Sequence, residues 1–116
     1  MGRPVVHWEL WSKNPSAVSD FYQAVFGWEV KHLEDMHYWV VETGGEGGIN
    51  GGIMRPREGP WPGNMCFYVK VDDLATYLAK VEAAGGKTLV SRQDVPGVGA
   101  LALFEDPDGR VMGIWE

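Results

Sequence analysis

The sequence predicts an α+β fold made of two tandem βαβββ modules, whose curved mixed sheets form a concave cleft and carry their helices on the outer face. The same order of apolar runs and helical patterns occurs on both sides of residues 56–63, which are rich in proline and glycine. The apolar positions of the two predicted helices also correspond at one constant offset. They are Val18, Phe21, Tyr22 and Val25 in the first helix and Leu74, Tyr77, Leu78 and Val81 in the second. We therefore expect one domain over residues 1–116, with module one at 4–55, a linker at 56–63 and module two at 64–116.

The first module opens with a strand at residues 5–11, where alternation separates two faces. One face carries His7, Glu9 and Trp11, and the other carries Val6, Trp8 and Leu10. The following helix has Asn14 as its N-cap, Pro15 as its first residue and Gly27 just past its end, and we expect its aromatic stripe to be buried. Strands at 28–33, 38–43 and 49–55 complete the module, the last one weakened by two adjacent glycines.

The second module repeats this order. A strand at 65–71 leads to a helix that Asp72 and Asp73 can cap, and a further strand begins at 87–91. The last two strands, 100–104 and 111–115, flank an Asp-Pro-Asp-Gly turn at 106–109, which is typical of a β-hairpin.

The charge and cysteine content limit the function classes. The net charge is −6 with a pI near 5.0, and no run of Lys or Arg is present, which argues against nucleic acid or a membrane as a partner. Cys66 is the only cysteine, and the first residues lack the apolar region of a signal peptide. We therefore expect a protein of the reducing cytoplasm.

The order of four short motifs resembles the vicinal oxygen chelate superfamily, which includes glyoxalase I, bleomycin-resistance proteins and extradiol dioxygenases. The motifs are His7 in the first strand, Asp20-Phe21-Tyr22 leading to Val25-Phe26-Gly27-Trp28, Ala84-Gly85-Gly86, and Phe104-Glu105-Asp106-Pro107-Asp108-Gly109. The resemblance covers essentially the whole chain. It implies a two-module fold with a cleft, and a homodimer as the usual assembly of such short chains.

In metal-using members of that superfamily, the first and fourth strands of each module supply one ligand each. Carried over by position, these sites are similar to His7, Asn50, Cys66 and Gly113 in this chain. Because glycine has no donor atom and an amide is a poor ligand, a metal here would need His7, Glu9 and Cys66 together. We therefore expect no cofactor, with a divalent metal as the alternative.

His7 and Glu9 are the candidate catalytic residues, because a carboxylate beside a buried imidazole can tune it for acid–base work. The alternative is a structural pair that satisfies its own hydrogen bonds. Cys66 is more typical of a small buried apolar residue than of a nucleophile. The other candidate ligand-binding residues follow from strand alternation and from the resemblance. They are Trp11, Asn50, Met54, Cys66, Tyr68, Lys70, Val111 and Trp115.

A cleft wall of this kind suits a flat aromatic or amphipathic compound. The sequence therefore favours a metal-independent small-molecule-binding protein that forms a homodimer. Two alternatives remain open: a lyase, isomerase or dioxygenase that uses His7 with Glu9, and a non-catalytic subunit that only dimerises or docks on a partner. Whether the protein is an enzyme is left undecided, with metal-dependent glyoxalase or dioxygenase chemistry disfavoured. Whether the modules pair within one chain or exchange across a dimer is also left open.

Overall fold

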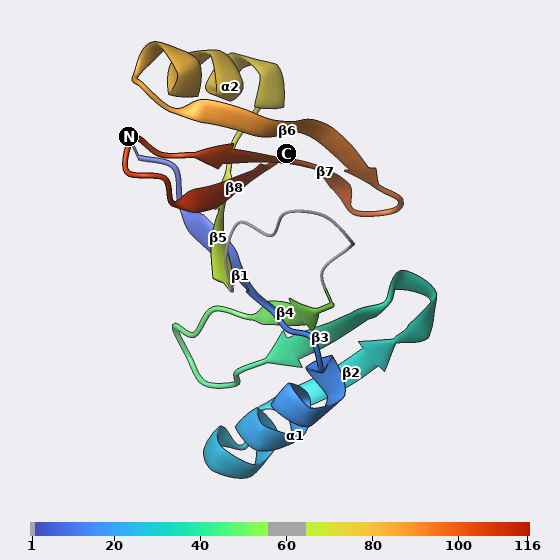
Figure 1. Ribbon diagram of the computed structural model, residues 1–116. Helices are drawn as coiled ribbons and strands as arrows, with labels where there is room; N and C mark the ends of the chain where they lie inside the picture. The colour runs from blue at the N-terminus through green and yellow to red at the C-terminus, as the bar shows by residue number, and fades with distance from the viewer. Residues whose placement is uncertain (1, 56–64) are drawn as a thin grey trace. The chain divides into compact units, whose positions relative to one another are not determined.

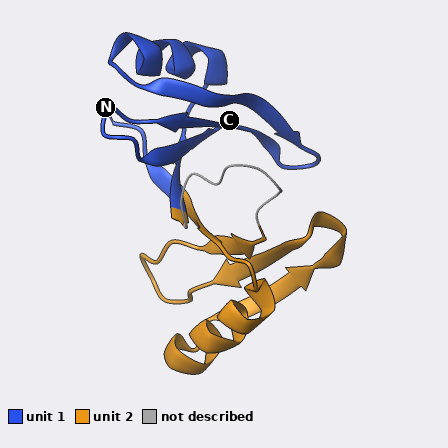
Figure 2. Ribbon diagram, in the orientation of Figure 1, with its two compact units in different colours: residues 1–6, 66–116 blue, residues 7–65 orange. Residues whose placement is uncertain are grey.

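The computed structural model describes residues 2–55 and 65–116 of the chain. The chain divides into two compact units, which Figure 2 shows in different colours. Unit 1 comprises Met1–Val6 and Cys66–Glu116, and unit 2 comprises His7–Met65. The residues before His7 belong to the same unit as Cys66–Glu116, whereas the sequence prediction assigned residues 4–6 to module one. The predicted linker at 56–63 lies outside the described residues.

Polar contacts explain why the N-terminal residues belong to unit 1. The carbonyl of Pro4 accepts a hydrogen bond from the backbone N–H of Lys70 at 2.9 Å. The Arg3 guanidinium forms an ion pair with Asp72 at 2.9 Å and donates to the hydroxyl of Tyr77 at 2.7 Å. The start of the first strand is therefore held by the strand and helix of the other module.

Unit 2 is a four-stranded mixed sheet with one helix, α1, against it (Figure 1). Its elements are β1 (Val5–Trp11), α1 (Pro15–Phe26), β2 (Glu29–Leu33), the 3₁₀ turn η1 (Glu34–Met36), β3 (Tyr38–Glu42) and β4 (Gly51–Met54). The strand order is β2-β3-β4-β1, in which β1 and β4 are parallel and the other pairs are antiparallel.

Unit 1 repeats this arrangement with a second helix, α2. Its elements are β5 (Met65–Lys70), α2 (Leu74–Ala83), β6 (Lys87–Val95), β7 (Gly99–Glu105) and β8 (Val111–Trp115). The strand order is β5-β8-β7-β6, again with one parallel pair, β5 and β8. The predicted order of elements in both modules is confirmed. In the part of the chain that the structure describes, no helix has both the length and the apolar character needed to cross a bilayer.

The two helices differ in how they bury their apolar residues. In unit 1 two of the predicted apolar positions of α2, Leu74 and Leu78, are buried in a core with four other residues, which lie on β7, on β8 and directly after β5. These four are Val71, Ala100, Ala102 and Ile114. This core lies on the face of β8 opposite Gly113, so α2 covers that opposite face.

In α1 the prediction of a buried aromatic stripe is wrong. Phe21 and Val25 are 57% and 54% exposed, whereas the buried residues of this helix are Pro15 and Ser19. The aromatic rings instead stack sideways, with Tyr22 lying 5.1 Å from the ring of Trp28. Helical spacing gave the correct helix, but it did not fix the rotation of the helix about its axis.

The β7–β8 hairpin forms as predicted. The Oδ1 atom of Asp106 accepts hydrogen bonds from the backbone N–H groups of Asp108 at 2.8 Å and Arg110 at 3.0 Å. Gly109 adopts a positive φ of 84°, which an L side chain would disfavour.

Strand β4 is shorter than the predicted 49–55. The carbonyl of Ile49 accepts a hydrogen bond from Nε1 of Trp8 at 2.6 Å, and Oδ1 of Asn50 accepts one from the backbone N–H of Thr43 at 3.0 Å. These two contacts hold residues 49 and 50 in the loop before the strand begins at Gly51.

Candidate functional site

Three residues of β1 and one of β3 form a continuous hydrogen-bonded chain in unit 2. Nε1 of Trp11 donates to Oε1 of Glu9 at 2.7 Å, and the hydroxyl of Tyr38 donates to Oε2 of Glu9 at 2.9 Å. Nε2 of His7 lies 2.7 Å from the same Tyr38 hydroxyl. The predicted pair of His7 and Glu9 is therefore brought together through Tyr38, on the face of β1 that alternation assigned to them. We call this set, His7, Glu9, Trp11 and Tyr38, the polar chain.

The polar chain is largely removed from solvent. Glu9 and Trp11 are each 7% exposed, and a carboxylate at such a position needs hydrogen-bond donors to offset its desolvation. Both oxygens of Glu9 have a protein donor, which meets this need. Burial lowers the pKa of His7, and the negative charge of Glu9 opposes this shift only in part. The imidazole is therefore held toward its neutral form.

Tyr38 was not among the predicted site residues. Its ring reaches the polar chain because it crosses Gly52 of β4, where the Cβ of any other residue would collide with the phenol group. The neighbouring Gly51 makes room for the ring of Trp8 in the same way. The adjacent glycines were the available signal, since a glycine within a strand often marks a close approach by another group.

The remaining predicted residues of unit 2 lie in different places. Met54 is the register partner of Tyr38 and shares its face of the sheet. Asn50 lies outside β4 and is exposed, with its side chain bound to Thr43. The structure therefore brings Met54, but not Asn50, to the strand face of the polar chain.

The predicted residues of unit 1 lie on the neighbouring strands β5 and β8, along with the paired residues Tyr68 and Gly113. Tyr68 is the register partner of Gly113, and its ring fills the space where a side chain at position 113 would stand. Cys66, Tyr68 and Val111 are buried, at 3%, 4% and 7% exposure, and Trp115 is half-buried. Lys70 is exposed. Tyrosine over glycine thus occurs in both units, with Tyr38 over Gly52 and Tyr68 over Gly113.

The residues at the positions that the family resemblance implies do not fit a metal ion. Gly113 supplies no donor atom and Tyr68 covers it, while Oδ1 of Asn50 already accepts from Thr43. Both oxygens of Glu9 accept from Trp11 and Tyr38. Across residues 2–55 and 65–116, no three His, Cys, Asp or Glu side chains are grouped as metal ligands would be.

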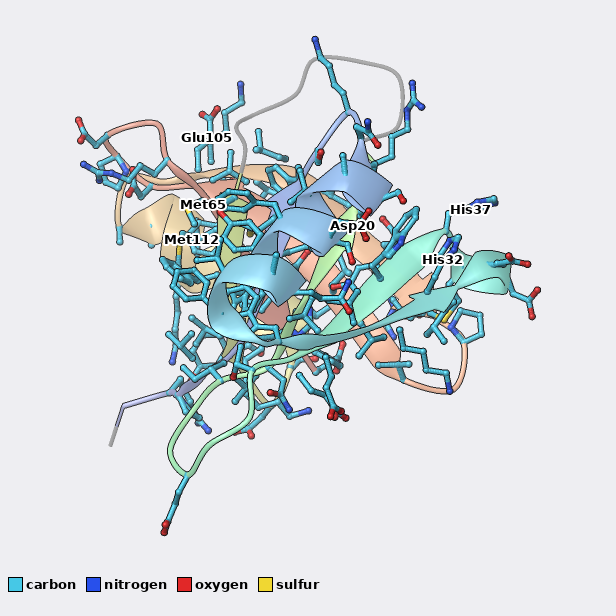
Figure 3. The ribbon with its side chains drawn as sticks, turned by 90° about the horizontal axis from the view of Figure 1, so that it is seen from below. Asp20, His32, His37, Met65, Glu105 and Met112 are labelled. Atoms are coloured by element: carbon cyan, nitrogen blue, oxygen red, sulfur yellow. The ribbon has the colours of Figure 1, made fainter. Side chains whose placement is uncertain are left out.

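Two further histidines, His32 and His37, lie on the hairpin of β2, η1 and β3 (Figure 3). The ring of His32 stacks on that of Trp39 at 3.9 Å between centroids and 4° between planes. Since Trp39 follows Tyr38 on the strand, this stack lies on the opposite face of the sheet from the polar chain.

A groove of ≈ 490 Å³ also opens along the first part of α1. It is lined by Leu10, Trp11, Ser12, Asn14, Ala17, Val18, Phe21, Tyr22 and Met65. His7, Glu9 and Tyr38 do not line it. The groove is therefore separate from most of the polar chain and does not define its ligand.

Comparison with known proteins places the chain in a family. Residues 5–112 match the model of the Glyoxalase/Bleomycin resistance protein/Dioxygenase superfamily. The chain is 32% identical over 109 residues to "Putative glyoxylase CFP32" of Mycobacterium tuberculosis, covering 91% of this chain and 41% of that protein. It is 30% identical over 122 residues to "Anthracycline biosynthesis protein DnrV" of Streptomyces peucetius, covering 92% and 44%. It thus spans about two fifths of the length of these curated relatives.

A solved structure has the same fold. The crystal structure of a glyoxalase/bleomycin resistance protein/dioxygenase superfamily member from Vibrio splendidus 12B01 superposes with a TM-score of 0.66 and 18% identity, covering 98% of each chain. The match of the family model over most of the chain agrees with this likeness of fold. The chain belongs to the glyoxalase/bleomycin resistance protein/dioxygenase superfamily.

Proposed function

We propose that the chain binds a small aromatic or amphipathic compound on the strand face that carries the polar chain, and that it does so without a metal ion. The observation that carries this proposal is the buried carboxylate of Glu9, both of whose oxygens accept hydrogen bonds from aromatic side chains, Trp11 and Tyr38. Coordination of a metal ion by Glu9 would break these hydrogen bonds. On the same face the half-buried rings of His7 and Tyr38 lie beside these fixed polar atoms, a combination that suits small organic ligands.

The name of one relative supports this ligand class. One relative at 30% identity is named for anthracycline biosynthesis, and anthracyclines are fused-ring aromatic compounds.

Titration with a panel of aromatic compounds, followed by tryptophan fluorescence and calorimetry, tests the proposal. We expect saturable binding that weakens about fivefold in His7→Gln, because loss of one hydrogen bond to the compound costs about 1 kcal/mol. Binding should also weaken in Trp11→Phe, because Oε1 of Glu9 then lacks the donor that holds it in place. His32→Gln is the matched control, since His32 stacks on Trp39 on the other sheet face. Prior treatment with EDTA should leave the affinity unchanged. Binding that is lost on metal removal, or is equal in all variants, would contradict the proposal.

A second candidate function is proton transfer without a metal, with His7 as the base. The polar chain favours it, because a neutral imidazole linked through Tyr38 to a carboxylate is arranged to accept a proton. Exchange of an acidic C–H of a bound compound with D₂O, followed by NMR, would detect the activity. Exchange at the same rate in His7→Gln would exclude His7 as the base.

We propose a homodimer as the assembly. The support is the exposed apolar surface of α1, where Phe21, Val25 and Phe26 are each more than half exposed. Light scattering after size-exclusion chromatography should give twice the chain mass of 12.9 kDa. Phe21→Ser with Phe26→Ser should shift the protein to monomer. A monomer for the unaltered chain would exclude this assembly.

A further inference from the structure

Helix α1 carries an apolar stripe that points away from the sheet of unit 2. Ser19 is 4% exposed, so its side of the helix lies against the sheet. At about 100° per residue, Phe21 lies roughly on the opposite side of the helix from Ser19. Three further apolar residues lie within about 60° of Phe21, and all of them are exposed. They are Ala17, Ala24 and Val25, and with Phe21 they form the outer stripe of α1.

The outer stripe is complementary to a second copy of itself. When two α1 helices pack antiparallel with a twofold axis at Phe21, residues equally far from Phe21 in the sequence come to the same level. Ala17 then meets Val25 of the second copy, and the half-buried Val18 meets Ala24. Each level thus pairs a small side chain with a larger one, as close packing requires. In a parallel pair each residue would meet its own copy, which leaves a gap between two alanines and crowds two valines.

The charges at the two ends of α1 favour the same orientation. Lys13 and Glu29 are both exposed, and they are equally far from Phe21 in the sequence, one before the helix and one after it. The antiparallel pair therefore brings Lys13 of each copy to the level of Glu29 of the other. A parallel pair would set like charges at the same level at both ends. Antiparallel order also places each helix N-terminus beside the C-terminus of the other helix, which suits their dipoles.

We infer that a second copy of this chain covers the outer stripe, and that the two α1 helices pair antiparallel about Phe21. The pairing rests on the homodimer proposed above, to which it adds the contact surface and its orientation. Phe26 lies outside this contact although it is 61% exposed, because it lies about 140° around the helix from Phe21.

Disulfide formation between copies tests the orientation, in a Cys66→Ala background that has no other cysteine. We expect co-expressed Ala17→Cys and Val25→Cys chains to crosslink to each other. Neither should crosslink to its own copy, because two copies of either residue lie about 12 Å apart along the helices, beyond the reach of a disulfide. Maleimide labelling of both cysteines controls for their reactivity. A crosslink within either single variant, or none between them in a protein that is dimeric by light scattering, would overturn the antiparallel pairing. A monomeric unaltered chain would overturn the pairing and the proposed homodimer together.

Exchange of the two end charges tests the pairing without added cysteines. Measured by sedimentation over a range of concentrations, Lys13→Glu should weaken dimerisation about fivefold, because it sets like charges at both ends of the contact. The double variant with Glu29→Lys should restore it. Phe21→Ser should give a monomer, whereas Phe26→Ser, which removes a similarly exposed ring outside the stripe, should leave the dimer intact. Equal weakening in the double variant, or loss of the dimer in Phe26→Ser alone, would overturn this contact surface.

Discussion

Replacing Gly113 by alanine tests the packing of a tyrosine ring over a glycine. A Cβ built at this position lies 2.5 Å from two ring carbons of Tyr68, closer than van der Waals contact allows. Overpacking in a well-packed interior costs about 1–3 kcal/mol. Gly113 does not have a positive φ, so alanine fits the backbone and should return about 0.4–1 kcal/mol by restricting the unfolded chain. We therefore expect Gly113→Ala to lower the free energy of unfolding by about 1–2 kcal/mol.

The same substitution should change sign when the ring is absent. In a Tyr68→Val background, Gly113→Ala should be neutral or stabilising by up to about 1 kcal/mol, because only the backbone effect remains. Urea unfolding followed by tryptophan fluorescence measures all four proteins of this double-mutant cycle. Gly2→Ala is the control, since nothing lies within 4 Å of its Cβ position, and it should change stability by less than about 0.5 kcal/mol. An equal loss in both backgrounds, or no loss in either, would refute the packing argument.

Three further outcomes can be measured by denaturant unfolding. Trp11→Phe removes the 2.7 Å hydrogen bond to Glu9 and should lower the free energy of unfolding by about 1.5–3 kcal/mol, which is typical of a hydrogen bond to a charged group. A smaller loss would mean that another donor replaces Trp11. The pKa of His7 in the folded state lies below its ordinary value of 6.5, so the unfolded chain binds a proton on His7 more readily than the folded chain does. The free energy of unfolding should therefore fall as the pH drops through about 6.5. His7→Gln should lack this fall, and an equal fall in the variant would show that other groups cause it. Asn14→Ala removes the side-chain cap on Ala17 and should cost about 1 kcal/mol, while unchanged stability would show that water replaces this cap.

Local patterns predicted the order of elements in each module, because capping residues, turn residues and strand alternation act over a few neighbours. Asn14, Gly27 and Gly109 mark their helix ends and turn as expected. The aromatic face of α1 was placed wrongly, because the spacing of Phe21 and Val25 fixes a helix face but not what covers it. That choice depends on packing between elements, which spacing along one chain does not contain.

Only part of the candidate site could be predicted from the sequence, because the rest depends on packing between strands. His7, Glu9 and Trp11 lie on one strand, so alternation alone grouped them. Tyr38 comes from another strand, and its approach depends on the register of β3 with β4 and on the empty space above Gly52. Strand register was not predicted, so Tyr38 could not be joined to the pair that it links.

The path of the N-terminal residues makes one unit discontinuous in sequence and the other continuous. Unit 2 is inserted between the two segments of unit 1, which are held together by Pro4 at Lys70 and by Arg3 at Asp72. A chain cleaved within residues 56–63 would therefore leave its second half without its own first segment. The two repeated modules, although alike in order and topology, are not interchangeable pieces that could be separated at the linker. Adding back a peptide of residues 2–6 would be needed to complete the separated second half.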